Sequence, residues 1–229
     1  MSSAPQSTTP TVPLHERRRR ATRLEIARAA AALFARDGVD QTTAEDIARA
    51  SGVALRTFYR YFRTKQDAVA PLLLAGADRW RARLAELLDA LTGGGTAGEH
   101  ARSAPAHDLV EALAVSVAET MAEGDDGGPE GLEWTRSLLR AAESDEALRD
   151  VWYRVNRQSE ERLAEVLEGW PGFGDDPVAH RLAAAAATDA VRLSIERWAA
   201  TDAPPEGDDG PAALVDRCLR MLAAGVFSS

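Results

Sequence analysis

The chain has 229 residues, 45% of them hydrophobic, which allows one or two domains with a buried core, and its leaning toward Ala, Leu, Arg and Glu favours an all-α fold. The formal net charge of −9 argues against an unselective nucleic-acid coat, although residues 1–67 carry 12 Lys and Arg against 7 Asp and Glu, while the remainder carries 15 against 29. The single cysteine, Cys218, excludes an intramolecular disulfide and favours the reducing cytoplasm, and no run of 18 apolar residues predicts a membrane span.

Residues 1–20 are expected to form a disordered, basic arm. Residues 1–13 are rich in Ser, Thr and Pro, and Arg17–Arg20 is an unbroken basic run. Such a run either follows phosphates or enters a minor groove of DNA, or it serves as a solubilising tail. The sequence leaves both readings open.

A first helix is predicted from near Leu14 or shortly after it. Its apolar residues recur at helical spacing, at Ile26, Ala27, Ala30, Leu33 and Phe34. Gly38 is placed to end the helix as a left-handed (αL) residue.

Two short helices are predicted next, on either side of Gly52. Thr43 begins the first of them, with Asp46 at the third position of a capping-box pattern. The second covers roughly residues 55–61, and Leu55, Phe58 and Phe62 should point inward. Two amphipathic helices joined by a turn that contains glycine are typical of a helix-turn-helix, which places its second helix in the major groove of DNA.

The outward side of the helix at 55–61 carries side chains suited to a DNA duplex. Arg56 and Arg60 lie one turn apart, and a guanidinium can bind guanine O6 and N7 or a phosphate. Thr57 and Tyr59 offer hydroxyls to phosphates or base edges, and Tyr61 can reach a phosphate from the helix end. Lys65 lies in the first turn of the next helix, where we expect it to clamp a phosphate. The alternative reading of these residues is a solvated basic face.

The remaining sequence predicts helices separated by polar breaks, without strands or repeats. Thr64 and Asp67 form a second capping pattern, which opens a helix to about Leu91, and Pro71 should kink this helix or delay its regular start. Gly93–Gly95 should end it. Further helices are predicted at about 105–122, 130–142, 144–168, 177–201 and 211–227, which makes about nine in all.

Residues 21–67 resemble the N-terminal domain of the TetR family of bacterial transcriptional regulators. The resemblance is carried by IARAAAALFARDG, TTAEDIARASGV and TFYRYFRTK. It implies an all-α homodimer with an N-terminal three-helix DNA-binding domain at 21–67 and a larger effector-binding and dimerisation domain at 68–229. It also implies a repressor that leaves its operator DNA when a small molecule binds, with DNA contacts at Thr43, Arg56, Thr57, Tyr59, Tyr61 and Lys65. Ala54 departs from the family pattern, which often has a serine cap at this position.

Two late segments suit a dimer interface, because each has an apolar stripe. The stripes comprise Val178, Leu182, Ala185, Ala186 and Leu193 in the first segment, and Leu214, Cys218, Met221, Leu222 and Gly225 in the second. Paired from two subunits, these helices would form a four-helix bundle. The alternative is that both stripes pack within one chain.

The sequence RSLLRAAESDEALRDVWYRVNRQSEERLAEVL, at 136–167, resembles the acyl-CoA-like ligand-binding domain of TetR members related to the mycofactocin regulator. This likeness implies an elongated apolar cavity for a hydrophobic effector that is acyl-CoA-like. Large apolar residues such as Trp134, Trp152 and Trp198 lie in the same half of the chain, where they line either a cavity or an ordinary core.

No catalytic motif is present, and we expect neither an enzyme nor a bound cofactor or metal. The four histidines are scattered without zinc-ligand spacing, and P-loop, GxSxG and dinucleotide-binding fingerprints are missing. The partners expected are double-stranded operator DNA, a second copy of the chain and an unidentified effector. An activator with the same motifs, or a DNA-binding protein that needs no effector, remains the alternative.

Overall fold

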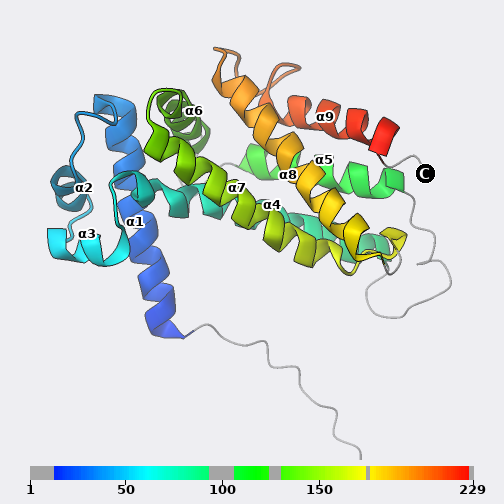
Figure 1. The fold of residues 1–229 in the computed structure, drawn as a ribbon, viewed down its shortest axis with the longest axis horizontal. Coiled ribbons are helices and arrows are strands. Elements are labelled where there is room, and N and C mark those ends of the chain that lie inside the picture. The colour runs from blue at the N-terminus through cyan, green and yellow to red at the C-terminus, as the bar shows by residue number, and fades with distance from the viewer. Residues whose placement is uncertain (1–12, 93–105, 124–129, 174–175, 227–229) are drawn as a thin grey trace, which may run out of the picture.

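The computed structural model describes residues 13–92, 106–123, 130–173 and 176–226, and within these ranges the fold is all-α (Figure 1). The described residues form nine α-helices, as the sequence predicts, with short 3₁₀ turns and no strand. The helices are α1 (Leu14–Asp37), α2 (Ala44–Ala50), α3 (Leu55–Tyr61), α4 (Ala70–Thr92), α5 (Ala106–Glu123), α6 (Glu130–Ala142), α7 (Glu146–Leu167), α8 (Pro177–Ala199) and α9 (Pro211–Val226).

The N-terminal end of the described chain is helical: the predicted start of a helix near Leu14 is confirmed, whereas the expectation of a disordered arm over residues 1–20 is wrong for residues 14–20. Pro13 itself has an extended backbone, with φ −54° and ψ +144°, and its carbonyl accepts hydrogen bonds from the N–H groups of Glu16 and Arg17. Arginine is a good helix former, so Arg17–Arg20 continue α1 instead of leaving it. Residues 1–12, which carry the rest of the predicted arm, lie outside the described residues.

The helix-turn-helix forms as predicted from its caps. Thr43 Oγ1 accepts from the Asp46 N–H at 3.1 Å, and an Asp46 carboxylate oxygen accepts from the Thr43 N–H at 3.1 Å. Gly52 in the turn has φ +68°, a left-handed conformation that a side chain would strain. Ala54 gives α3 no side-chain cap, yet α3 begins at Leu55, because the Ala54 carbonyl accepts from two N–H groups of the helix.

The end of α1 differs from the prediction in one backbone angle. Gly38 has φ +85° but ψ +158°, which is a fully extended left-handed conformation and not αL. Its N–H still bonds the Phe34 carbonyl, so one carbonyl of the last turn keeps a partner. Glycine is required here because this region of backbone space is almost closed to other residues.

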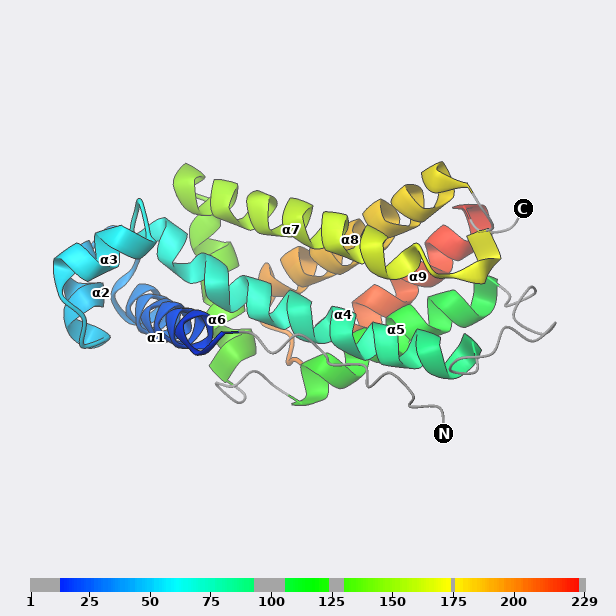
Figure 2. The ribbon, with the colours of Figure 1, turned by 90° about the horizontal axis from the view of Figure 1, so that it is seen from below.

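We call α1–α3 the head and α4–α9 the body. Two long helices of the body connect the body to the head. Figures 1 and 2 both show the head at one end, with α4 and α7 running away from it side by side. A 3₁₀ turn at Gln66–Val69 precedes α4, so Pro71 falls in its first turn and delays its regular start, as predicted.

The head and the near end of the body share one hydrophobic core. Phe58 and Phe62 are 0% and 3% exposed, and they belong to the same buried cluster as Leu72 of α4 and Val155 of α7. A second cluster fills the far end of the body, between α4, α5, α7, α8 and α9. The head therefore cannot tilt without repacking the near ends of α4 and α7.

Candidate nucleic-acid interface

The helix α3 buries one side and exposes the other. Phe58 is fully buried, whereas Arg56, Tyr59 and Arg60 are exposed, with Tyr59 at 53%. Thr57 is half-buried. The outward placement of the arginines is confirmed, and α3 offers two guanidinium groups and the Tyr59 hydroxyl on a surface free to meet another molecule.

Tyr61 ends α3 between two arginines. The Cζ atoms of Arg19 and Arg60 lie 5.9 Å and 5.1 Å from the centre of its ring, within cation–π distance. These stacking contacts bring the N-terminal part of α1 to the C-terminal end of α3. Both arginines keep N–H groups for an anion such as a phosphate.

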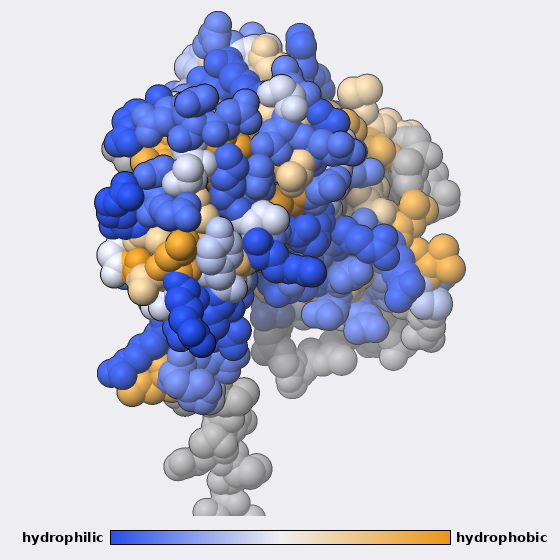
Figure 3. All heavy atoms as spheres, turned by 60° about the vertical axis from the view of Figure 1, so that its left-hand side comes forward, coloured by the Kyte–Doolittle hydropathy of each residue, from blue (hydrophilic) through white to orange (hydrophobic). Residues whose placement is uncertain are grey.

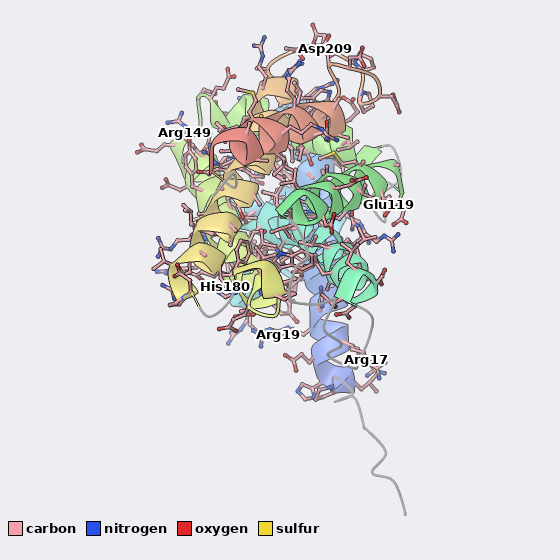
Figure 4. The ribbon with its side chains drawn as sticks, turned by 90° about the vertical axis from the view of Figure 1, so that its right-hand side faces the viewer. Arg17, Arg19, Glu119, Arg149, His180 and Asp209 are labelled. Carbon is pink, nitrogen blue, oxygen red and sulfur yellow. The ribbon has the colours of Figure 1, made fainter. Side chains whose placement is uncertain are left out.

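A broad basic hollow lies between α1 and the end of α3. Its described lining residues are Leu14, His15, Arg18, Arg19, Thr22, Arg60 and Tyr61. Figures 1 and 4 show that this end of α1, which carries Arg17 and Arg19, projects beyond the body. Figure 3 views the molecule with the head turned toward the reader, and the surface on this side is mainly hydrophilic. Sequence reasoning missed the hollow because it assigned Arg17–Arg20 to a disordered arm.

Thr43 lies at the N-terminus of α2 with an exposed but occupied side chain. Its hydroxyl donates to the Asp46 carboxylate at 2.6 Å, and Asp46 also binds Arg49 at 2.9 Å. The Thr43 hydrogen bonds, followed by those from Arg49, hold the pKa of the Asp46 carboxyl below its ordinary value. Thr43 therefore serves mainly as the N-cap of α2, and one lone pair of its hydroxyl remains to accept a hydrogen bond from a partner.

The sequence predicts that Lys65 clamps a phosphate, but its ammonium group is bonded mainly within the head. Its Nζ donates to the backbone carbonyls of Val39 and Thr42, at 2.7 Å and 2.9 Å. Both carbonyls belong to the α1–α2 connection, and that of Val39 also accepts from the Thr42 N–H at 3.3 Å. Two of the three N–H groups of Lys65 thus hold the head together, which the sequence could not show because the partners lie 23 or more residues away.

The head is tied to the body by polar contacts as well as by the shared core. Asp78 of α4 accepts from Arg20 of α1 at 3.2 Å, from Arg162 of α7 at 2.8 Å, and from Arg81 one turn along α4. Arg81 is 5% exposed, and it also donates to Ser159 of α7 at 2.7 Å. Burial lowers the pKa of Arg81, although Asp78 opposes this shift.

A cavity of about 140 Å³ lies in the body between α4, α5, α6, α7 and α8. Its lining is mostly apolar and includes Leu72, Trp80, Trp152 and Val155. Leu72 and Val155 also belong to the core that the body shares with the head. Of the large apolar residues noted in the sequence, Trp152 lines this cavity, whereas Trp198 is fully buried beside Leu214.

An apolar stripe on α8 remains exposed on the body. Val178, Leu182 and Leu193 are 68%, 53% and 52% exposed, and Met221 of the neighbouring α9 is 71% exposed. In contrast, Leu214 packs inside the chain, so α9 does not present the full stripe that the sequence indicates.

Within the described ranges, no helix is long and apolar enough to cross a membrane, and no three His, Cys, Asp or Glu side chains gather as metal ligands would.

Replacing Lys65 with methionine should destabilise the protein by about 1–3 kcal/mol, because two carbonyls of the α1–α2 connection lose a charged donor. Arg63 is exposed and forms no hydrogen bond to this connection, so Arg63→Met supplies the control, which should leave stability nearly unchanged. Urea unfolding of both variants checks this expectation. Equal stability of Lys65→Met and the parent protein would show that the two hydrogen bonds contribute nothing.

Comparison with known proteins adds independent findings. Residues 26–70 match the family described as bacterial regulatory proteins of the tetR family. The chain is 27% identical to the HTH-type transcriptional regulator TcmR of Streptomyces glaucescens over 188 residues, which are 81% of this chain and 76% of that protein.

Solved structures extend the likeness to the whole fold. The chain resembles FadR of Thermus thermophilus, a TetR-family transcriptional repressor in complex with lauroyl-CoA, with a TM-score of 0.54 and 25% identity over 90% of this chain and 96% of FadR. A TetR-family regulator from Syntrophomonas wolfei shares the fold with a TM-score of 0.58 and 18% identity, over 92% and 98% of the two chains. The helix-turn-helix and the likeness along the body agree: residues 26–70 match the tetR family of bacterial regulatory proteins, and the chain resembles TetR-family transcriptional regulators over most of its length.

Proposed function

We propose that the protein is a homodimeric repressor that reads a near-palindromic operator through α3 and leaves it when a small hydrophobic effector binds the body. The observation that carries the proposal is that α3 has a buried side and an exposed side. Phe58 is buried, whereas Arg56, Tyr59 and Arg60 are exposed. In this proposal, residues 21–67 are the DNA-binding domain and 68–229 the regulatory domain, and the protein acts in the cytoplasm.

The roles on DNA follow from side-chain chemistry. Arg56 and Arg60 bind guanine edges or phosphates in the major groove, and Thr57 and Tyr59 add hydroxyl contacts. Tyr61 contacts a phosphate, with Arg19 and Arg60 stacked on its ring. Thr43 contacts a phosphate at the start of α2, and Lys65 contributes the one N–H that its internal hydrogen bonds leave.

The basic hollow extends the proposed interface along α1. Arg18 and Arg19 line it, and the stacking of Arg19 on Tyr61 aligns it with the end of α3. Phosphates of the operator backbone would lie there, because closely spaced arginines in a concave surface attract anions. Of the two readings of the basic run, the helical geometry favours contact with DNA over a solubilising tail.

The dimer forms through α8 and α9. Val178, Leu182, Ala186 and Leu193 lie on one face of α8 because their spacing of four, four and seven residues follows the helical repeat. An exposed apolar stripe of this length is typical of a protein interface. Two such pairs of helices would form a four-helix bundle and set the distance between the two copies of α3.

The cavity is the proposed effector site, since it is mostly apolar and is lined by residues of five helices. Leu72 and Val155 line it and also pack in the core shared with the head. An effector that displaces either residue therefore repacks the support of α3. A coupling of about 1–3 kcal/mol between the two sites would be enough for regulation.

An acyl-CoA-like effector is a second candidate. The likeness to T. thermophilus FadR, which was solved in complex with lauroyl-CoA, favours it. An activator shares every feature described above, so the direction of regulation rests on the family likeness alone.

Arg56→Ala should lose preference for one base position in each half-site, at a cost of about 1–3 kcal/mol for the matched operator. The operator is first selected from random duplexes by the full-length protein, and affinities are then measured by fluorescence anisotropy on the site and on its single-base variants. Arg49→Ala is the control, because Arg49 is exposed on α2 and pairs with Asp46. An equal loss on all sequences would assign Arg56 to a phosphate instead.

Leu182→Glu should convert the protein from a dimer to a 24.6 kDa monomer, because a carboxylate would be buried without a partner at the centre of the α8 stripe. Val115→Glu is the matched control, since Val115 is also exposed but lies on α5. Sedimentation equilibrium at micromolar concentration distinguishes the two states. A parent protein that sediments as a monomer would contradict the proposed interface.

Arg20 and Asp78 should be coupled in DNA binding, because their ion pair links α1 to α4. A double-mutant cycle with Arg20→Met and Asp78→Asn, measured on the selected operator, should give a coupling of about 0.5–2 kcal/mol. The pair Arg83 and Glu119 lies wholly within the body and provides the control cycle, for which no coupling is expected. Equal coupling in the two cycles would refute a specific role for the α1–α4 contact.

A further inference from the structure

The hydroxyl of Thr188, on α8, is buried without a hydrogen-bond partner. Thr188 is 4% exposed, and no protein atom binds its Oγ1. A helical threonine can donate to the carbonyl four residues before it, but Thr188 does not. The other buried hydroxyls among the described residues have partners: Thr42 donates to Gly38, Ser116 to Leu113 and Ser194 to Ala190, and Ser159 accepts from Arg81.

Thr188 lines the body cavity, and the polar groups around it are already engaged. Thr120 and Thr135 each donate their hydroxyl proton to a carbonyl of their own helix, at 2.7 Å and 3.0 Å. Asn156 donates to the Trp152 carbonyl at 2.9 Å. Ser159, also in the lining, accepts from Arg81, so among the described lining hydroxyls Thr188 is the one that forms no hydrogen bond at all. An unpaired polar group in an apolar site is costly, so a ligand oxygen that pairs with it gains affinity.

The charge and size of the cavity restrict the ligand further. Among the described lining residues Arg79 is the one charged side chain, and no carboxylate is present. A cation would be desolvated there beside a like charge and without a carboxylate, whereas an anion would meet the Arg79 guanidinium and a neutral group would cost least to desolvate. The volume of about 140 Å³ is close to that of an engineered cavity of about 150 Å³ that accepts benzene.

We propose that the cavity binds a compact, neutral or anionic molecule, with one aromatic ring and short substituents, whose oxygen forms a hydrogen bond with Thr188. Its role as effector rests on the proposed function, but the binding itself does not. Thr188 is then a specificity-determining residue, and a long acyl chain is disfavoured.

Four probes of one shape test the ligand class by calorimetric titration of the full-length protein. They are 4-propylphenol, 4-propylbenzoate, propylbenzene and 4-propylbenzylammonium. We expect 4-propylphenol and 4-propylbenzoate to bind about 3- to 10-fold more tightly than propylbenzene, and the cation to show no binding. Binding of the cation as tight as that of the phenol would overturn the proposal.

Substitution of Thr188 tests the hydrogen bond. Thr188→Val keeps the shape and removes the hydroxyl, so 4-propylphenol should lose its 3- to 10-fold advantage while propylbenzene binds as before. Thr188→Ser should retain the advantage, which keeps the test valid if the valine variant folds poorly. Ser194→Ala is the matched control, since Ser194 is buried on the same helix with its hydroxyl bonded to Ala190, and it should change neither affinity. The ligand-free Thr188→Val protein should also have a higher Tm, because an unpaired polar group is removed.

Two further outcomes separate this inference from the proposed function. If 4-propylphenol binds through Thr188 but leaves operator affinity unchanged, the result supports the binding site and refutes its role as the effector site. If lauroyl-CoA binds and releases operator DNA, while 4-propylphenol fails to bind or ignores Thr188→Val, the proposed function stands and this inference is overturned.

Discussion

The burial of Phe58 and Phe62 is the constraint on which the rest of the structure depends. Because these rings pack into a core that also contains Leu72 and Val155, α3 has one allowed rotation about its axis. That rotation brings Arg56, Tyr59 and Arg60 to the surface. The same rings join the head to α4 and α7, so the surface offered to DNA and the packing of the body cannot change independently.

The cavity lies where this shared core meets the core of the far body. Its wall includes Leu72 and Val155 from the first cluster and Trp80 from the second. Ser159, also in the wall, bonds Arg81, which pairs with Asp78 and so reaches Arg20 on α1. Exposed pairs such as Arg20 and Asp78 contribute little energy alone, so we attribute most of any coupling to the packed side chains and the rest to this polar chain.

Local signals predicted most of the fold, and long-range contacts account for what they missed. The Thr43–Asp46 box, the turn at Gly52 and the spacing of Phe58 and Phe62 are local, and they fixed α2 and α3 correctly. The hydrogen bond from Lys65 to Val39 spans 26 residues. The unpaired hydroxyl of Thr188 lines a cavity to which five helices contribute. Neither feature therefore has a local signature in the sequence. The helical state of Arg17–Arg20 could have been inferred from arginine's helix propensity after Pro13, but the disordered composition of residues 1–13 outweighed it. The DNA contacts themselves stay predictions.

The most direct test of the account is methylation interference on the selected operator. Methylation of guanine N7 blocks the major-groove edge that a guanidinium on α3 would bind. We predict two symmetry-related groups of guanines whose N7 methylation prevents binding, with centres about one helical turn (~34–36 Å) apart or at a related spacing. Binding that tolerates N7 methylation at every guanine, and is blocked by minor-groove methylation alone, would show that α3 does not enter the major groove and would contradict the account.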